Sequence, residues 1–463
     1  MGALTLQKSA ARALGGVFMR KGTDPSFYGT ESIGKVLLKI APPVMLALLI
    51  QALYNIVDSF FVGKYSEHGL TALSVVYPIQ LIAIALAVGT GVGVNTLMAR
   101  FYAEKHEDSA NETAGCGFVI SLIMWTVFAL VSFLSMRFFI NLSASDPLAV
   151  EYAVTYGNIV CVGSIGLFTE SIFTKVHQAE GNMTLPMIAQ ITGAVCNIVL
   201  DPIMIFGMFG CPKMGIAGAA VATVCGQVLA AVITGIKGLR RPPAPYKFLF
   251  YTKSIFILGY PSILMQSLYT VYIMVLNMIL MHFCDEAVTV LGLYYKIQSF
   301  FFIPLTGLQT CMVPIISYNY AMENYTRVRR TLKIAAGITA AFMIIGTACF
   351  ELIPVQLLGI FSNSEKVFEI GRVALRIIGI SFVPATFSLM MPIFFQAIGK
   401  AAPSVLLTLS RQIFCLIPIF YAMSFIGLNY TWIAFPAAEI ITGSIGIALY
   451  LKQIHAWGCG KKC

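Results

Sequence analysis

The sequence predicts an all-α polytopic membrane protein, in which twelve transmembrane helices form two six-helix bundles related by an internal parallel repeat. Hydrophobic residues make up 58% of the 463 residues and charged residues only 11%, whereas soluble proteins carry about 25% charged residues. About twelve apolar runs fill most of the chain, each close to the roughly 20 residues that a bilayer span needs. The second half of the chain also repeats features of the first half in one register.

Residues 1–36 form a basic segment ahead of the first predicted span. Lys8, Arg12 and Lys21 surround a short apolar stretch at 13–19, which lacks the uninterrupted core and the cleavage site of a signal peptide. We therefore expect a basic helix that rests on the cytoplasmic surface of the membrane.

Residues 37–238 contain the first six spans and form the predicted N-lobe. Asp58 lies near the outer end of the first span, and the second span contains the glycine-rich stretch Gly89 to Gly93. No strand precedes these glycines, so we expect them to permit close helix packing and not to bind a nucleotide. Residues 100–113 are rich in charge and predict a solvated cytoplasmic loop.

Residues 239–253 are basic and rich in proline, which predicts a cytoplasmic linker. Residues 254–452 contain six more spans and form the predicted C-lobe, and 453–463 form a cytoplasmic tail. If the chain starts inside, 23 of the 30 Lys and Arg residues lie on the inner side and 7 outside. This bias predicts a cell-membrane protein with both termini in the cytoplasm.

A shift of 218 residues aligns the two halves at many separate points. One register that holds across so many elements indicates an internal duplication. Six spans in each lobe give both lobes the same orientation, so they should be related by an axis along the membrane normal, with a substrate site between them. The aligned residues include Tyr77 with Tyr295, Gln80 with Gln298, Gly89 with Gly307, Tyr102 with Tyr320, Pro43 with Pro261 and Gln178 with Gln396.

The charge and the cysteines fit a membrane protein. The net charge of +10 comes from Lys and Arg residues that lie mostly on the predicted cytoplasmic side, so it does not indicate nucleic-acid binding. Most of the 11 cysteines lie in apolar runs, where cysteine behaves as a small hydrophobic residue. Only Cys211 and Cys284 fall in predicted outer loops, and a disulfide between them stays an open alternative.

Polar residues in three spans of the N-lobe form a candidate ion site. Asn197 and Asp201 are four residues apart and share one helix face. Counted from the outer ends of their spans at about 1.5 Å per residue, Asp58, Asp201 and Thr223 lie at similar depth. Two carboxylates, an amide and a hydroxyl could surround a monovalent cation or hold a proton, since a buried acid needs a partner.

The repeat provides an internal comparison for these acids. In the second half, Asp58 aligns with Leu276, and Asp201 aligns with Pro418 or Ile419. A purely structural role would need the same polar contacts in both halves. The asymmetry therefore favours a functional role for these acids over a structural one.

Three spans of the N-lobe carry a recognisable set of residues: Pro43, Gln51 and Asp58 in the first span, Asn197, Asp201 and Pro202 in the fifth, and Gly218 to Thr223 in the sixth. This set resembles the multidrug and toxic compound extrusion (MATE) family, and most closely its MepA-like bacterial branch. The resemblance implies a secondary active exporter of amphipathic, often cationic, compounds that contributes to antibiotic resistance, without a cofactor, in antiport with H⁺ or Na⁺ by alternating access. It further implies that the family's N-lobe cation site maps onto Asp58, Asn197, Asp201 and Thr223. We expect small-molecule substrates, contacts with membrane lipids, no nucleic acid and a monomer.

The C-lobe departs from the family pattern. Some members carry an acidic pair there, but the seventh span has Gln266 and Tyr269 without an acid, which argues against a second ion site. Arg411 lies in the inner half of the eleventh span, and we expect its long stem to reach the interface. The residues expected to line the substrate cavity are Gln51, Tyr54, Tyr77, Gln266, Gln309, Met312 and Glu439.

Three other functions compete with this interpretation. A flippase for a lipid-linked oligosaccharide could use the same scaffold, but a pyrophosphate group would need several buried arginines and only Arg411 lies deep in a span. A membrane-embedded enzyme is disfavoured, because the spans contain no His-Glu-x-x-His and the loops are short. A passive channel would give flux without coupling. The same oxygen atoms serve Na⁺ and H⁺, so both ions stay open.

Overall fold

The computed structural model describes residues 25–143, 146–361 and 364–459, and nearly all of them are helical. Within these ranges, ten helices are long and apolar enough to cross a bilayer, and the number reaches twelve if each of two bent helix pairs is one span. This agrees with the twelve spans predicted. The same ranges contain no strand, so the all-α fold class is confirmed. The predicted surface helix at 13–19 lies outside the described residues.

The chain divides into two compact units, and the middle of helix α4 belongs to the second unit while its ends belong to the first. Unit 1 comprises the described residues up to 75 and residues 97–252, and unit 2 comprises residues 76–96 and the described residues from 253 onward. The first half of the chain contains α2 (Phe27–Thr30), α3 (Ile33–Tyr65), α4 (Glu67–Ala103), α5 (Glu107–Ser143), α6 (Pro147–Val162), α7 (Ile165–Ala179), α8 (Thr184–Phe206), η1 (Met208–Gly210) and α9 (Ile216–Gly238). The second half contains α10 (Pro245–Met281), α11 (Asp285–Ala321), α12 (Tyr325–Leu352), α13 (Pro354–Gly359), α14 (Glu365–Gly379), α15 (Phe382–Ala397), α16 (Ala401–Leu409), η2 (Ser410–Leu416), α17 (Ile417–Ser424), α18 (Leu428–Thr431) and α19 (Ala434–Cys459).

The helix boundaries confirm the internal repeat. A shift of 218 residues carries both ends of α4 onto both ends of α11, and the end of α7 onto the end of α15. The two bent pairs are also equivalent, since α6 meets α7 at 42° and α14 meets α15 at 54°. The duplication therefore extends from single residues to the positions where helices start, bend and stop.

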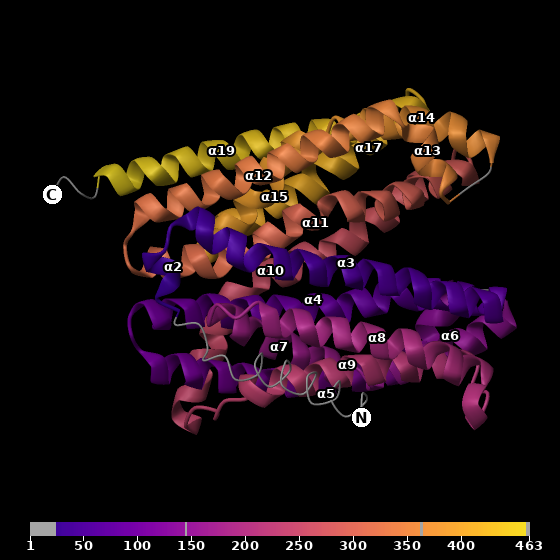
Figure 1. Ribbon diagram of the computed structural model, residues 1–463. Coiled ribbons are helices and arrows are strands. Elements are labelled where there is room, and N and C mark those ends of the chain that lie inside the picture. Colours follow the sequence, from indigo (N-terminus) through magenta and orange to yellow (C-terminus); the bar gives the residue numbers. More distant parts are fainter. Residues whose placement is uncertain (1–24, 144–145, 362–363, 460–463) are drawn as a thin grey trace, which may run out of the picture. The chain divides into compact units, whose positions relative to one another are not determined.

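Small residues allow the helices of unit 1 to pack closely. Helices α8 and α9 run side by side (Figure 1), and a Cβ atom on Gly193 would lie 2.6 Å from the backbone oxygen of Gly226. Near the other end of the pair, a Cβ atom on Gly218 would lie 2.6 Å from the backbone of Met204. Because lipid offers no hydrophobic driving force between helices, such close backbone contact stabilises the pair through packing. Helix α3 packs on α8.

The glycine-rich stretch of α4 has the packing role that the sequence predicts. A Cβ atom on Gly93 would lie 2.2 Å from the backbone oxygen of Ile255 in α10, and one on Gly89 would lie 2.7 Å from the backbone nitrogen of Ile263. No larger residue fits at either position without a backbone shift. These contacts lie within unit 2.

The predicted loop at 100–113 is wrong, because α4 continues to Ala103 and α5 already begins at Glu107. Glu107 and Asp108 lie in the first turn of α5. Negative side chains at this end of a helix are stabilised by the helix dipole, so the charged residues extend the helix beyond the bilayer.

The remaining sequence expectations concern the lobes and the cysteines. Helix α9 ends at Gly238 and α10 starts at Pro245, a residue type that suits the first turn of a helix. The division into lobes at 37–238 and 254–452 stays a prediction. Cys211 and Cys284 are both free thiols.

Candidate ion-coupling site

Three helices of unit 1 carry the four residues of the predicted ion site. Asp58 lies on α3, Asn197 and Asp201 lie on α8, and Thr223 lies on α9. Asp58 is 8% exposed, Asn197 is 3% exposed and Asp201 is fully buried. Pro202 follows Asp201 inside α8, and its missing N–H interrupts the backbone hydrogen bonds there.

The structure brings these four side chains together. The carboxyls of Asp58 and Asp201 lie close enough to interact directly. The amide Nδ2 of Asn197 donates to Asp201 Oδ1 at 3.3 Å and to Thr223 Oγ1 at 3.4 Å. One continuous polar cluster therefore links α3, α8 and α9.

Three oxygen atoms of this cluster are buried and have no hydrogen-bond partner, namely Asp58 Oδ1, Asn197 Oδ1 and Asp201 Oδ2. A buried polar atom without a partner is costly and usually indicates a missing ligand, water or proton. Two carboxylates with amide and hydroxyl oxygens fit a hard monovalent cation, and the paired carboxyls fit a proton.

A small cavity opens directly beside the cluster. It has a volume of about 100 Å³ and lies among α3, α7, α8 and α9, where Asn197 and Thr223 contribute to its wall. Gln51 and Tyr54, both expected in the substrate cavity, also line it. The cavity therefore joins part of the predicted substrate set to the ion site within one unit.

Glu170 faces the same cavity, although it is not among the residues predicted for the site. Its Oε1 accepts a hydrogen bond from Thr174 Oγ1 at 2.6 Å and from Gln190 Nε2 at 3.5 Å. The spacing of Glu170 and Thr174 by four residues places both on one helix face. That spacing was the available sequence signal.

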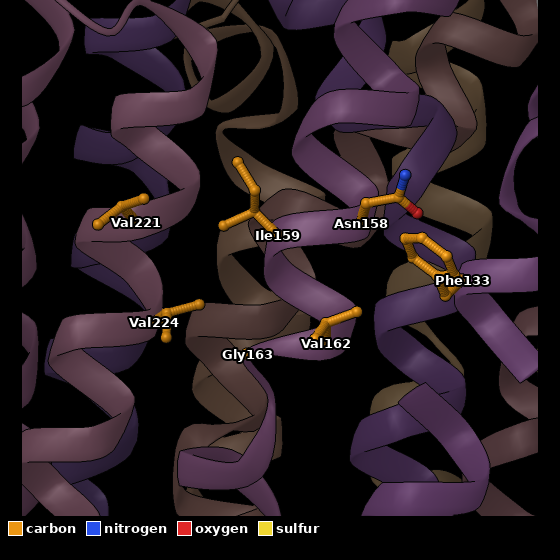
Figure 2. Close-up of a pocket in the computed structure, with 7 residues that line it drawn as sticks. All are labelled: Phe133, Asn158, Ile159, Val162, Gly163, Val221 and Val224. Carbon is orange, nitrogen blue, oxygen red and sulfur yellow. The ribbon is translucent and has the colours of Figure 1, made fainter. Parts of the chain in front are cut away.

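A larger hollow in unit 1 has a different chemistry. Figure 2 shows Phe133 of α5, Asn158 of α6 and Val221 of α9 around it, and its volume is about 450 Å³. Apart from Asn158, its side chains are apolar. An apolar hollow cannot stabilise an ion, so the smaller polar cavity is the better functional candidate despite its size.

The other five residues expected in the substrate cavity belong to unit 2. Tyr77 is 54% exposed, whereas Met312 is fully buried. Gln309 Nε2 donates to the backbone oxygen of Leu389 at 2.8 Å. Glu439 is buried against Arg411. The role of these residues and of Gln266 in a substrate cavity stays a prediction.

Arg411 does not extend to the interface as expected. Its Nη2 lies 2.6 Å from Glu439 Oε1, and the two side chains are only 12% and 7% exposed. The attraction of a buried carboxylate outweighs the access to water that the long stem would allow. The expectation failed because it considered Arg411 without its neighbour on α19.

A second charged cluster lies at the end of α7, outside the spans. Arg240 Nη2 lies 2.8 Å from Glu180 Oε1, and Tyr102 OH donates to the same oxygen at 3.3 Å. Burial alone would raise the pKa of Glu180, but the side chain of His177, whose Nδ1 lies 3.7 Å from Glu180 Oε2, and the charge of Arg240 outweigh it and hold this pKa below its ordinary value. The cluster ties the α7–α8 turn to the segment after α9.

Comparison with known proteins gives a consistent family. A model of the MatE family matches residues 43–203 and 261–422, so one matched segment lies in each half of the chain. The multidrug export protein MepA of Staphylococcus saprophyticus is 22% identical over 440 residues, which cover 92% of this chain and 96% of MepA. An FAD transporter of Shewanella oneidensis is 22% identical over 430 residues, which cover 90% of this chain and 94% of that protein.

The fold agrees with solved structures. An outward-facing MATE family transporter of the MOP superfamily superimposes with a TM-score of 0.87 at 22% identity, covering 95% of this chain and all of that one. The apolar helices and the matched family together indicate a multi-pass protein of the plasma membrane. The family consists of transporters and not enzymes, and its members need no cofactor. The chain therefore belongs to the multidrug and toxic compound extrusion (MATE) family, and it is similar to the MepA transporters within that family.

Proposed function

We propose that this transporter exports amphipathic, often cationic, small molecules in exchange for protons that bind at Asp58 and Asp201. The buried contact between these two carboxyls carries the proposal. Two carboxylates in contact in a buried site cannot both ionise cheaply, so at least one of them should carry a proton. This requirement favours H⁺ over Na⁺ as the coupling ion.

Asn197 and Thr223 orient the carboxyl pair. The Asn197 amide donates to one oxygen of Asp201 and thereby stabilises the charge that remains when the two acids share a single proton. Thr223 accepts the second N–H of the same amide. The hydroxyl therefore fixes the amide in the orientation that Asp201 needs.

Transport further requires that the two alternating states bind the proton with different affinity, because equal affinity would shift no equilibrium. Protonation lowers the negative charge of the carboxyl pair and so changes the packing of α3 against α8 and α9. We propose that the protonated state favours release of the compound outside and that the proton leaves on the cytoplasmic side. We also propose that both termini lie in the cytoplasm and that the protein works as a monomer among membrane lipids.

The polar cavity of unit 1 is our candidate contact surface for the exported compound. Gln51 and Tyr54 offer a hydrogen-bonding and an aromatic surface, and Glu170 offers a negative charge for a cationic group. Its volume of about 100 Å³ fits only part of a drug-sized compound, so the rest of the compound must lie elsewhere. The name of MepA supports multidrug export as the activity.

Reconstituted vesicles test the proposal. The protein is inserted into liposomes, and uptake of a fluorescent cationic dye such as ethidium is driven separately by a pH gradient and by a Na⁺ gradient. We expect a pH gradient to drive uptake and a Na⁺ gradient at constant pH to drive none. Asp201→Asn should abolish the response to the pH gradient.

Asp108→Asn is the matched control, since Asp108 is an exposed aspartate at the start of α5. It should transport as the unmodified protein does. Uptake driven by a Na⁺ gradient alone would mean that Na⁺, and not the proton, is the coupling ion at the same residues. Wild-type uptake by Asp201→Asn, at equal protein per vesicle, would refute the assignment of the coupling site. Downhill flux without response to either gradient would indicate a channel.

A lipid-linked oligosaccharide flippase is not favoured. Such a substrate would need free arginines for its pyrophosphate. The guanidinium of Arg411 is already bound by Glu439.

A further inference from the structure

Unit 2 contains a buried charge centre of its own. Within the described residues, the buried acids are Asp58, Asp201 and Glu439. The first two face each other in unit 1, whereas Glu439 faces Arg411 in unit 2. Each unit therefore has one buried acidic centre, and only the centre of unit 2 includes a base.

Both carboxylate oxygens of Glu439 accept hydrogen bonds. Arg411 Nε lies 2.9 Å from Glu439 Oε1 and 3.1 Å from Oε2, and Nη2 donates to Oε1 at 2.6 Å. Ser388 Oγ on α15 donates to Oε2. Both carboxylate oxygens thus have donors, in contrast to the unpaired oxygens of Asp58 and Asp201.

An unusual backbone places the arginine in this position. Arg411 lies in the π-helical segment η2, which ends just before Pro418 at the start of α17. Proline lacks an N–H, and its ring clashes with the carbonyl four residues earlier, so a wider turn relieves the clash. Single π-turns of this kind occur frequently at functional sites.

The pair has no counterpart in unit 1. Under the repeat, Arg411 aligns with Gly193 or Ala194, and Glu439 aligns with Val221 or Ala222. Gly193 instead allows α8 to touch α9, because its Cβ would lie 2.6 Å from the backbone oxygen of Gly226. Each half has therefore placed its charges at different positions of a common scaffold.

We propose that the Arg411 guanidinium is a built-in counter-cation that occupies the acidic centre of unit 2, so that this unit takes up no transported ion and coupling depends on unit 1 alone. The part about coupling rests on the proposed function. The claim that Arg411 occupies the acidic centre does not rest on it, because that claim concerns only the group that neutralises the charge of Glu439.

Removal of the arginine should turn this centre into a binding site for a free cation. In Arg411→Ala, Glu439 and Ser388 still face the space that the guanidinium leaves. Guanidinium and methylguanidinium reproduce the planar donor group that the carboxylate binds, whereas choline has no N–H donor. We expect millimolar guanidinium to raise the Tm of Arg411→Ala saturably by several degrees, and choline to leave it unchanged.

The experiment is carried out in detergent on the full chain with Asp58→Asn and Asp201→Asn also present. The carboxyl pair of unit 1 is then absent, and a cation effect that appears only with Arg411→Ala must come from unit 2, so the result does not depend on whether unit 1 is the coupling site. The protein with only these two substitutions should show no stabilisation by guanidinium. Arg376→Ala in the same background is the matched control, since Arg376 is exposed and donates to a backbone oxygen of Glu351.

The outcomes separate the alternatives. A Tm of Arg411→Ala that does not respond to guanidinium, or a response equal to that of Arg376→Ala, would overturn the proposal. If Arg411→Ala does not accumulate, Arg411→Ala with Glu439→Gln should restore folding, because no charge then stays uncompensated. Failure of that double variant would also overturn it, since the defect would not lie in the charge.

Discussion

Asp58 of α3 and Asp201 of α8 meet in the interior of unit 1, where their carboxyls lie in direct contact. Asn197 donates to Asp201 from one helical turn away. In the proposed function both carboxyls share one proton, so they should behave as one functional element and not as two independent groups.

We therefore expect the effects of Asp58→Asn and Asp201→Asn on transport to be strongly non-additive. Each single variant should lower dye uptake driven by a pH gradient by about tenfold or more, equivalent to about 1.4 kcal/mol of coupling. The double variant should be little worse than either single one, since the first substitution already removes the shared proton. Initial uptake rates in vesicles measure this, and independent losses that multiply would contradict it.

Thr223 should contribute less than the acids, since it acts through Asn197. Thr223→Val keeps the shape of the side chain but removes the oxygen that accepts from Asn197 Nδ2. Loss of one neutral hydrogen bond costs about 1 kcal/mol, so we expect uptake to fall about fivefold. Thr223→Ser retains the hydroxyl and should transport at nearly the normal rate. Equal losses in both variants would indicate a packing role for the methyl group.

The contact of α8 with α9 should control the stability of the site. A Cβ atom on Gly193 would lie 2.6 Å from Gly226 O, so Gly193→Ala should push the helices apart and lower the stability by about 1 to 3 kcal/mol. Gly337→Ala on α12 is the control, because nothing lies within 4 Å of its added Cβ. That change should stabilise the helix by about 0.5 to 1 kcal/mol. Thermal unfolding in detergent measures both, and a neutral Gly193→Ala would refute the tight contact.

Much of the fold could be predicted from the sequence because membrane spans depend on local composition. The repeat also follows from the sequence, since residues such as Gly89 and Gly307 occupy equivalent positions. The ends of the helices were harder to predict. Glu107 and Asp108 look like loop residues by hydropathy, but charge at a helix N-terminus extends the helix into water.

The ion site was predictable to the extent that its residues share a helix face or a depth. Asn197 and Asp201 are four residues apart, and their spacing fixes their contact. The pairing of Arg411 with Glu439 was not predictable in this way. It depends on how α19 packs against η2 and on the wider turn at Arg411, and neither feature is visible in the local sequence of either residue.

The cluster at the end of α7 should stabilise the protein in a pH-dependent way. Glu180→Gln removes the ion pair with Arg240 at 2.8 Å, and we expect a loss of about 1 to 2 kcal/mol at neutral pH. The pKa of Glu180 is lower in the folded protein than its ordinary value. Its stabilisation is therefore fully present above about pH 4.3, the ordinary pKa of glutamate, and disappears as the pH falls through the lower folded value.

Chemical denaturation of the wild type and Glu180→Gln between pH 8 and pH 3 measures this difference. The two curves should stay parallel down to about pH 4.3 and converge below it. Glu369→Gln is the control, since Glu369 is an exposed glutamate on α14 and its replacement should change little at any pH. A difference between wild type and Glu180→Gln that persists unchanged at the lowest pH would mean that Glu180 stabilises the turn through packing. The charge of Arg240 would then have no part in holding the α7–α8 turn.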